Sequence, residues 1–242
     1  MSPYIVIIPT YNEKENADAI VRKTLSLQSA FDVLIVDDNS PDGTAQIVKA
    51  LQLEFPNRLH LLERKEKNGL GTAYIAGFKW CLERNYQYIF EMDADFSHNP
   101  DDLIKLLEAC EKEGNGLSVG SRYITGVNVV NWPISRVIMS YYASAYVRLV
   151  TGMTIRDATA GFVCYTRQTL ETIELDNIKF KGYAFQIEMK FKAFLAGIKI
   201  KEVPIIFTDR TKGTSKMSKK IFREAFFGVI ELKINSLFKK NG

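Results

Sequence analysis

The sequence predicts an α/β fold with a mostly parallel central sheet and helices on both faces. The first observation is an alternation: from residue 4 to about residue 122, short β-branched or aromatic runs alternate with longer stretches of 3.6-residue periodicity. The second is composition, because 46% hydrophobic and 25% charged residues over 242 positions are typical of one large globular domain. Such a sheet binds its ligands at the carboxyl ends of its strands.

The first half of the chain provides five strands and four helices. Its apolar runs predict strands at Tyr4–Ile8, Phe31–Asp37, Arg58–Leu62, Tyr86–Met92 and Leu117–Gly120. Between them, helical periodicity is expected near residues 14–27, 43–54, 71–84 and 101–112. Repeated βα units of this kind produce parallel strands.

After residue 122 the pattern is less regular. Arg136 opens a helix, Val137–Val150, that is apolar or aromatic nearly all round. At 1.5 Å per residue this helix is about 21 Å long, too short to cross a membrane, so it is either buried core or a helix lying in a membrane interface. A further helix begins within Lys181–Met189, and a last strand is expected at Ile200–Phe207.

Positive charge is concentrated at the C-terminal end. Residues 210–242 contain nine Lys and Arg against two Glu, a net charge of +7, whereas residues 1–209 carry −3. A helix over about 218–238 combines an apolar arc with flanking basic residues, which is typical of a helix on an anionic membrane. Docking against the rest of the protein is the alternative. The preceding loop, with Arg210, Lys212 and Lys216, suits either phosphate oxygens or solvent.

Three predicted strands end in polar segments. These segments are Pro9-Thr10-Tyr11-Asn12-Glu13, the run from Asp37 to Thr44, and Glu91-Met92-Asp93-Ala94-Asp95. The second is also good turn and helix-cap chemistry. Asp93 and Asp95 repel each other unless a cation lies between them, so a divalent metal is predicted; the alternative is a solvated loop with one capping Asp. No GxGxxG follows the first strand and no GxxxxGK[ST] occurs, so neither a Rossmann dinucleotide site nor a P-loop is supported.

Several classes of protein are disfavoured. Cys81, Cys110 and Cys164 form no CxxC pair, which argues against a disulfide framework or structural zinc and favours a reducing, cytosolic compartment. The N-terminal segment shows no signal-peptide pattern, and no apolar run reaches the roughly 18 residues of a membrane span. Nucleic-acid binding is not expected, because the basic residues are not interleaved with aromatics across a sheet.

The sequence resembles the dolichol- or polyprenol-phosphate mannose synthases of glycosyltransferase family 2. The resemblance is carried, in order, by PTYNE, VDDNSPDGT, NGLGTAY, MDADFSHNP, GSRY, SR at 135–136, DATAGF, KGYAFQIEM, EVPI and DRTKGTSKMS, and it covers nearly the whole chain. It implies one GT-A (Rossmann-like) domain over residues 1–217, with a nucleotide-binding half (1–122) and an acceptor half (123–217). A basic amphipathic helix over 218–242 follows.

The resemblance implies roles for individual residues. Guanosine binding is implied for Pro9, Tyr11, Glu13, Val36 and Asp38. Asp93, Ala94 and Asp95 would face the sugar diphosphate, with Asp93 and Asp95 holding Mg²⁺ or Mn²⁺, and Asp95 would be catalytic with Arg122 and Arg136. Donor phosphates would contact Arg122, Arg210 and Lys216, and the acceptor phosphate would contact Arg122, Ser135 and Arg136. Ser97 stands where some members have a Gln metal ligand.

The resemblance also implies an activity. Mannose would pass from GDP-mannose to a polyprenyl (dolichyl) monophosphate with inversion, on the cytosolic face of a membrane to which the protein binds peripherally. A separate membrane-anchor subunit is an allowed partner, because many members carry C-terminal transmembrane helices that this sequence lacks. UDP-glucose or UDP-N-acetylglucosamine as donor is the alternative within the same fold, and a non-catalytic membrane-binding module is a more distant one. Glu188 is either a further carboxylate of the site or a solvated helix residue.

Overall fold

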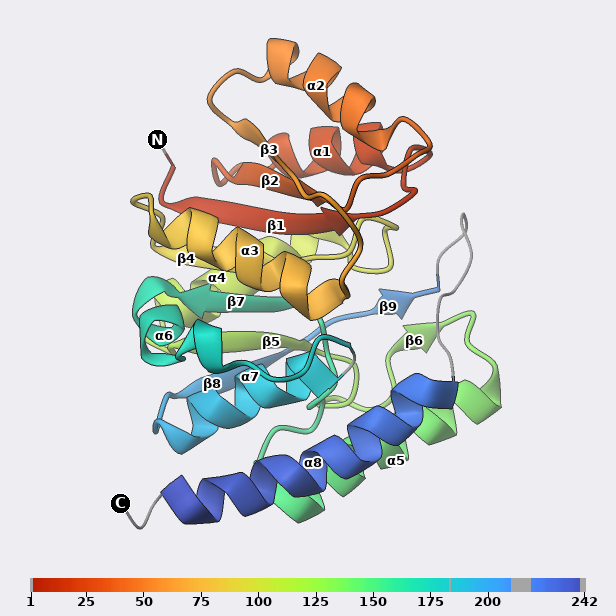
Figure 1. Ribbon diagram of the computed structural model, residues 1–242, viewed down its shortest axis with the longest axis vertical. Coiled ribbons are helices and arrows are strands. Elements are labelled where there is room, and N and C mark those ends of the chain that lie inside the picture. Colours follow the sequence, from red (N-terminus) through yellow and green to blue (C-terminus); the bar gives the residue numbers. More distant parts are fainter. Residues whose placement is uncertain (1, 183, 210–218, 240–242) are drawn as a thin grey trace.

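The computed structural model describes residues 2–182, 184–209 and 219–239 of the chain. A seven-stranded sheet runs through the middle of the molecule, in the order β3-β2-β1-β4-β7-β5-β8 (Figure 1). Its strands are β1 (Tyr4–Thr10), β2 (Asp32–Asp37), β3 (Leu59–Glu63), β4 (Tyr88–Glu91), β5 (Leu117–Ser121), β7 (Val163–Thr166) and β8 (Ile200–Pro204). The five strands predicted in the first half of the chain are all present, so the predicted mostly parallel α/β sheet is confirmed.

One strand of the sheet runs against the others. β7 lies between β4 and β5 and pairs antiparallel with both, through partners such as Phe90 with Cys164 and Ser118 with Cys164. It was not predicted, because four residues buried on both faces show no periodicity. The predicted strand Ile200–Phe207 is also wrong in extent: it divides into β8 and a short β9 (Phe207–Thr208), which pairs with β6 (Val129–Val130) in a separate two-stranded sheet.

Helices cover both faces of the sheet. One face packs against α1 (Ala17–Leu25), α2 (Thr44–Glu54) and α4 (Leu103–Glu111), and the other against α3 (Leu70–Leu82), α6 (Arg167–Thr172) and α7 (Ala184–Leu195). The 3₁₀ turns are η1 (Pro100–Asp102) and η2 (Leu175–Asn177). Successive residues of β1 alternate between the two cores, with Val6 and Ile8 in the first and Ile5 and Ile7 in the second. A strand buried on both faces therefore reads as a continuous apolar run.

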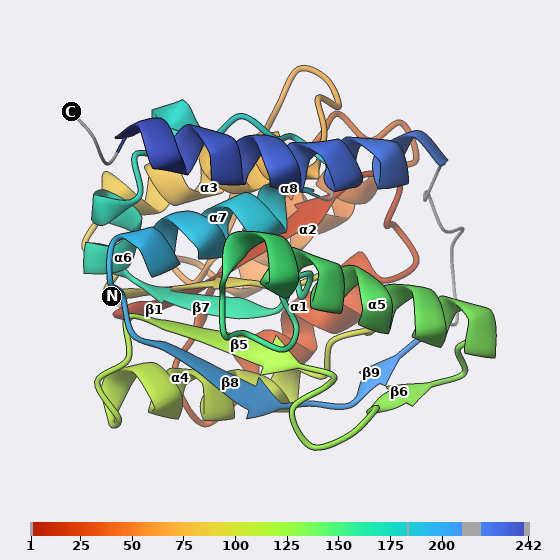
Figure 2. The same cartoon turned by 90° about the horizontal axis from the view of Figure 1, so that it is seen from below.

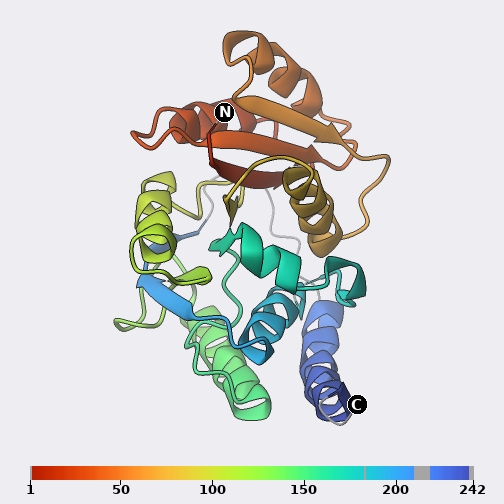
Figure 3. The ribbon, with the colours of Figure 1, turned by 90° about the vertical axis from the view of Figure 1, so that its left-hand side faces the viewer.

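Two further helices form a third layer beneath α7. They are α5 (Ile134–Thr151) and α8 (Lys219–Lys239), which lie side by side at the end of the molecule opposite α2 (Figures 2 and 3). A small core of Val147, Ile187, Phe191 and Val229 joins them to α7. The ring of Tyr146 stacks on Phe226 at 4.7 Å, and its hydroxyl donates to the Phe226 carbonyl at 2.9 Å. Docking of the C-terminal helix against the protein is thus observed.

The structure excludes one of the two interpretations of the apolar helix, that of buried core. α5 begins at Ile134, earlier than predicted, because Pro133 has the extended backbone that precedes a helix. The helix is not buried core: Ile134, Tyr142 and Leu149 are 73%, 66% and 85% exposed. Only Ser144, Val147 and Thr151 are buried. Among the described helices, none has both the length and the hydropathy that crossing a bilayer requires.

Candidate active site

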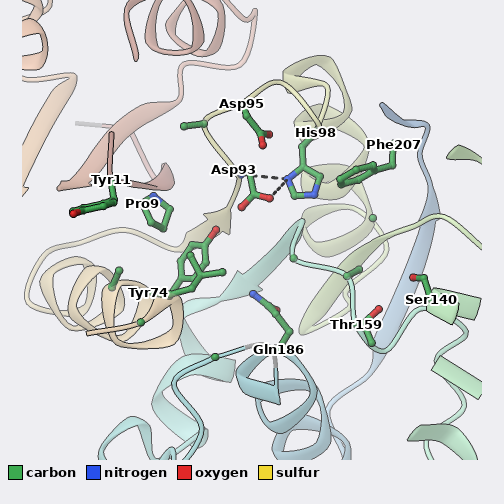
Figure 4. A pocket seen from close by; sticks show the side chains of 18 of the residues that line it. Pro9, Tyr11, Tyr74, Asp93, Asp95, His98, Ser140, Thr159, Gln186 and Phe207 are labelled. Atoms are coloured by element: carbon green, nitrogen blue, oxygen red, sulfur yellow. Dashed lines mark hydrogen bonds and ion pairs between the residues drawn. The ribbon is translucent and has the colours of Figure 1, made fainter. Parts of the chain in front are cut away.

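A cavity of about 480 Å³ opens at the carboxyl ends of the central strands. It lies where side chains after β1, β2, β4 and β5 meet residues of α3, α5 and α7 (Figure 4). Nine of the residues singled out from the sequence line it: Pro9, Tyr11, Glu13, Asp38, Asp93, Ala94, Asp95, Arg122 and Arg136. The cavity thus brings together residues up to 127 positions apart in the sequence, from Pro9 on β1 to Arg136 on α5.

The remaining predicted residues are placed elsewhere. Val36 is fully buried in the core between β2 and α3, so its side chain does not line the cavity. Ser135 is exposed on the first turn of α5 and does not line the cavity either. Arg210 and Lys216 lie outside the described residues.

Hydrogen bonds between two loops build one wall of the cavity, which Tyr11, Glu13 and Asp38 line. The backbone N–H of Glu13 donates to Thr44 Oγ1 at 3.1 Å, and that hydroxyl donates to Asp42 Oδ1 at 2.6 Å. The backbone N–H of Asn12 donates to Ser40 Oγ at 3.0 Å. The turn after β2 therefore holds the loop after β1 in place. Its cap and turn residues, which have an ordinary structural explanation, also position the cavity wall.

Charged groups flank this wall. Arg64 Nε lies 3.1 Å from Asp38 Oδ1, and both side chains are nearly buried. Burial raises the pKa of Asp38, although the Arg64 guanidinium opposes the rise. The Lys67 ammonium sits 4.2 Å from the centre of the Tyr11 ring. An aromatic face and a buried carboxylate side by side are suited to a nucleobase and its polar edge.

The acidic pair lies in the middle of the cavity. Asp95 is 7% exposed, and its Oδ1 accepts from the Ser97 backbone N–H at 3.1 Å. Asp93 donates its backbone N–H to His98 Nδ1 at 3.2 Å, and the His98 ring stacks on Phe162 at 4.8 Å (Figure 4). Burial lowers the pKa of His98 to about 4, so the imidazole is neutral and its Nδ1 can accept. The Asp95 carboxylate is therefore held by its own loop backbone, and His98 holds the main chain at Asp93.

The chemistry of this pair fits a hard divalent cation. Carboxylate oxygens are the ligands that Mg²⁺ and Mn²⁺ prefer, and Mg²⁺ is commonly bound by one or two carboxylates together with substrate phosphates. The Ser97 side chain is buried and does not line the cavity, so it adds no third ligand there. Within the described part of the chain, no group of three or more His, Cys, Asp or Glu side chains is arranged to hold a metal.

Arg122 is fixed by a bidentate ion pair on the other side of the cavity. Its Nε and one terminal nitrogen donate to the two oxygens of Asp157 at 2.7 and 2.6 Å, and its backbone N–H donates to Asp157 at 3.0 Å. Burial raises the pKa of the Asp157 carboxyl, but the charge and hydrogen bonds of Arg122 outweigh burial, so this pKa lies below its ordinary value. Asp157 precedes the missed strand β7 and was not predicted.

Arg136 projects from the first turn of α5 among aromatic residues. Its guanidinium lies 3.9 Å from the centre of the Trp132 ring and donates to Asp209 at 2.9 Å. Trp132 also packs edge-on against Phe207, at 5.3 Å between ring centres. Because β6 and β9 pair just beside these residues, the small sheet holds Arg136 at the cavity mouth.

The floor of the cavity contains polar residues that the sequence analysis did not single out. Gln186 from α7 and Tyr74 from α3 line it, and both are at least nine-tenths buried (Figure 4). Beneath Gln186 lie Glu91 and Lys190, both with no exposed surface. Burial raises the pKa of Glu91 to about 8 and lowers that of Lys190 to about 8. The motifs NGLGTAY and KGYAFQIEM contain Tyr74 and Gln186, but sequence alone does not show which helix face meets the cavity.

Glu188 has a structural role. It is 2% exposed, and its carboxylate accepts from the backbone N–H groups of Lys179 and Phe180 at 2.9 Å each. It therefore satisfies two backbone donors in the loop before α7. It is neither a solvated helix residue nor part of the cavity lining.

Comparison with known proteins decides the family. The family model described as glycosyl transferase family 2 matches residues 5–173. The chain belongs to glycosyl transferase family 2. The match confirms the family and the enzyme class that the sequence motifs of this glycosyltransferase predicted.

Two curated relatives match the glycosyltransferase along most of its length. It is 47% identical over 227 residues to a polyprenol monophosphomannose synthase of Mycolicibacterium smegmatis, covering 94% of this chain and 85% of the relative. It is 46% identical over 225 residues to an undecaprenyl-phosphate mannosyltransferase of Micrococcus luteus, covering 93% and 91%.

Solved structures of low sequence identity share the fold of the glycosyltransferase. Glucosyl-3-phosphoglycerate synthase from Mycobacterium tuberculosis, in complex with Mn²⁺, UDP and glucosyl-3-phosphoglycerate, has a TM-score of 0.68 at 15% identity, over 96% of this chain and 79% of that one. A mannosyltransferase from Pyrobaculum calidifontis, in complex with GDP-mannose and Mn²⁺, has a TM-score of 0.59 at 14% identity, over 98% and 76%.

Proposed function

We propose that the enzyme transfers mannose from GDP-mannose to a polyprenyl or dolichyl monophosphate, with inversion and with a divalent metal. The observation that carries this proposal is one cavity in which a nucleotide wall, an acidic pair and a cationic, aromatic mouth follow one another. The names of the two curated relatives support mannosyl transfer to a polyprenyl phosphate. The GDP-mannose complex of a structural neighbour supports this donor.

Different residues of the cavity would bind different parts of the donor. Tyr11 and Asp38 would hold the guanosine, with Pro9, Glu13 and the backbone at Val36 completing that wall. Asp93 and Asp95, beside Ala94, would hold Mg²⁺ or Mn²⁺, which when bound offsets the charge that develops on the leaving diphosphate. Arg210 and Lys216 remain proposed phosphate contacts from outside the described residues.

The acceptor side needs no general base. A phosphate monoester is already an anion near pH 7, because its second pKa is about 6. Arg136 at the cavity mouth would bind this anion, with Arg122 and Ser135 as further proposed contacts. Attack by a phosphate oxygen on the anomeric carbon, opposite the departing diphosphate, breaks the C–O bond to GDP and inverts that carbon. The Trp132 ring lies against the Arg136 guanidinium, whose side chain is 28% exposed and paired with Asp209, so an acceptor phosphate would take the place of that carboxylate.

The donor is tested directly by competition between nucleotide sugars. With a short polyprenyl phosphate and Mg²⁺ or Mn²⁺, we expect kcat/KM for GDP-mannose to exceed that for UDP-glucose and UDP-N-acetylglucosamine by about 10²-fold or more. Transfer of radiolabel to the lipid, with EDTA as the metal-free arm, measures this. Preferential use of either UDP sugar would replace the proposed donor, and transfer of none of the three would contradict the proposed function.

We propose further that the enzyme binds the cytosolic face of a membrane peripherally, from the cytoplasm, with a separate anchor subunit as an allowed partner. α5 lines the cavity with Arg136, Met139 and Ser140 and turns Tyr142 and Leu149 outward. On α8, Phe227, Leu237 and Phe238 are also exposed, by 59%, 56% and 75%. The two helices contact each other through Tyr146 and Phe226, and both expose apolar side chains that are proposed to meet the membrane.

Vesicle sedimentation tests this binding with a matched pair of variants. Leu149 on α5 and Leu53 on α2 are 85% and 86% exposed, at opposite ends of the molecule. We expect Leu149→Glu to lower partitioning onto anionic vesicles about tenfold or more, since losing one Leu contact with an apolar phase costs roughly 1.5–3 kcal/mol. Leu53→Glu should leave it unchanged. High salt should weaken binding of the wild type, and equal absence of all three proteins from vesicle pellets would contradict membrane binding.

A further inference from the structure

The floor of the cavity holds a side-chain amide in a fixed orientation. Gln186 Nε2 donates to Glu91 Oε2 at 2.6 Å, and Gln186 Oε1 accepts from Lys190 Nζ at 3.1 Å. Lys190 is held in turn by the carbonyl oxygens of Ala160 and Gln186, at 2.6 and 3.1 Å. The ammonium of Lys190 can only donate, so it fixes the amide oxygen on its own side and turns the amide nitrogen toward Glu91.

Half of the hydrogen-bonding capacity of this amide is still available for a ligand. A primary amide has two N–H donors and two carbonyl lone pairs, and Glu91 and Lys190 use one of each. One donor and one acceptor of fixed direction remain on a side chain that lines the cavity and is 4% exposed. A sugar hydroxyl both donates and accepts, so neighbouring hydroxyls of a hexose match this pair.

Tyr74 places a second polar group on the same floor. It is fully buried and lines the cavity, and its hydroxyl has no hydrogen-bond partner among the described residues. Its ring stacks parallel to Phe185, the neighbour of Gln186, at 6.0 Å and 4°. The hydroxyl is buried without a partner in the part of the chain that the structure describes, and leaving a buried hydroxyl unpaired is costly. A ligand in the cavity is the partner this geometry offers.

A purely structural role for these groups explains less. Replacing buried charges by apolar residues of similar volume is often neutral or stabilising, so a Glu91–Lys190 pair is not required to fill the core. In a network built only for stability, every buried polar atom would have a hydrogen-bond partner. Glu91 Oε1, however, is buried without a partner in the described part of the chain. What this pair does achieve is a fixed direction for Gln186.

We propose that Gln186 and Tyr74 recognise the hydroxyl pattern of the donor hexose, and that Glu91 and Lys190 are positioning residues that orient the Gln186 amide. Figure 4 shows Gln186 on the opposite side of Asp93 from the loop of Asp95 and His98, between Tyr74 and Thr159. A sugar linked to a diphosphate at the acidic pair would rest there. This inference rests on the proposed function, because it takes a nucleotide-linked hexose as the ligand.

Monodeoxy donors test the recognition of hydroxyls. Wild-type enzyme should use at least one of the 2-, 3-, 4- and 6-deoxy analogues of GDP-mannose far less well than GDP-mannose. Gln186→Ala should lower kcat/KM for GDP-mannose by roughly 10²-fold, because a sugar hydroxyl loses a buried partner. The same variant should no longer discriminate against the analogue that lacks this hydroxyl. GDP alone does not reach the floor, so its affinity in calorimetry should stay within about twofold of wild type.

Two variants act as matched controls. Gln52→Ala removes a partly buried glutamine whose amide donates to the Leu59 carbonyl, away from the cavity. Tyr165→Phe removes a buried, unpartnered hydroxyl in the same core cluster as Tyr74, from a residue that does not line the cavity. Both controls should keep wild-type discrimination.

Tyr74→Phe, which changes no volume beyond the hydroxyl, should reduce discrimination against one analogue by about tenfold.

Lys190→Met tests the positioning role. It keeps the length of the side chain and removes the ammonium that orients the amide. Discrimination against the analogue identified with Gln186→Ala should fall, with an unchanged GDP affinity as the sign that folding is intact. If Lys190→Met retains full discrimination, Lys190 does not orient the amide.

The outcomes separate this inference from the proposed function. If wild-type enzyme uses UDP-glucose instead of GDP-mannose, the proposed donor is wrong, and the same variants are compared with UDP-glucose and its deoxy analogues. If it transfers neither sugar, calorimetry of each nucleotide sugar against its nucleotide measures the contribution of the hexose to binding. The inference is overturned, whichever donor is used, if Gln186→Ala and Tyr74→Phe discriminate between hexoses as the wild type does.

Discussion

Replacing Asp95 by Asn should reduce glycosyl transfer by roughly 10³-fold, because the variant loses a carboxylate charge where the metal and the leaving diphosphate are proposed to meet. Asp95 is 7% exposed and its Oδ1 is already held by the Ser97 backbone N–H. The amide can keep that hydrogen bond while offering the cation a neutral, weaker ligand. We therefore expect the fold to survive and the metal affinity to fall.

Asp102→Asn provides the control for this change. Asp102 has the same 7% exposure and pairs with Lys105 at 2.7 Å, but it does not line the main cavity. It should retain nearly full activity. Activity is measured as label transfer over a range of Mn²⁺ concentrations, with circular dichroism as the check on folding. A folded Asp95→Asn protein that turns over at the wild-type rate in EDTA would show that the metal site is misassigned.

Replacing Asp157 by Asn should cost about 3–5 kcal/mol of folding free energy, because it leaves the Arg122 guanidinium buried without its counter-charge. Asp157 has no exposed surface, and Arg122 is 5% exposed. For a chain of this size, the loss corresponds to a fall in melting temperature of roughly 10 °C. Asp176→Asn, which breaks only the exposed pair with Lys79, should shift the midpoint by about 1 °C or less. Differential scanning calorimetry measures both.

Acid should remove the difference between the wild type and Asp157→Asn. The pKa of Asp157 is lowered in the folded protein from an ordinary value of 3.8. A lowered carboxyl pKa adds stability that is present above the unfolded pKa and is lost as the pH falls through the folded one. The stability gap should thus be constant near neutral pH and shrink below about pH 4. A gap that widens on acidification would contradict the ion-pair explanation.

The strand ends were predictable from the sequence, and the interactions across the cavity were not. The runs that precede Asp38 and Asp95 are mostly apolar, and such runs in βα order place their ends at one edge of a sheet. By contrast, the partner of Arg122 is 35 positions away, in a loop whose neighbouring strand has only four residues. Long-range pairing of this kind has no local periodicity to reveal it.

The helices show the same division. Periodicity predicted that α3 and α7 exist, but it did not show that Tyr74 and Gln186 face a cavity, because a buried position and a cavity-lining position have the same spacing. For α5 the nearly uniform apolar pattern left two interpretations open. The exposed side chains of Ile134 and Leu149 favour the interfacial one.

The antiparallel strand β7 has a consequence for the order in which the chain can fold. β1, β2, β3 and β4 find their parallel neighbours within the first 91 residues, so the nucleotide wall can form early during synthesis. β5 is made next, but its only partners are β7 and β8, which end at residues 166 and 204. Its edges stay unpaired until at least 40 more residues have been added. The part of the cavity wall that contains Arg122, at the end of β5, therefore cannot assemble until these later strands have been made.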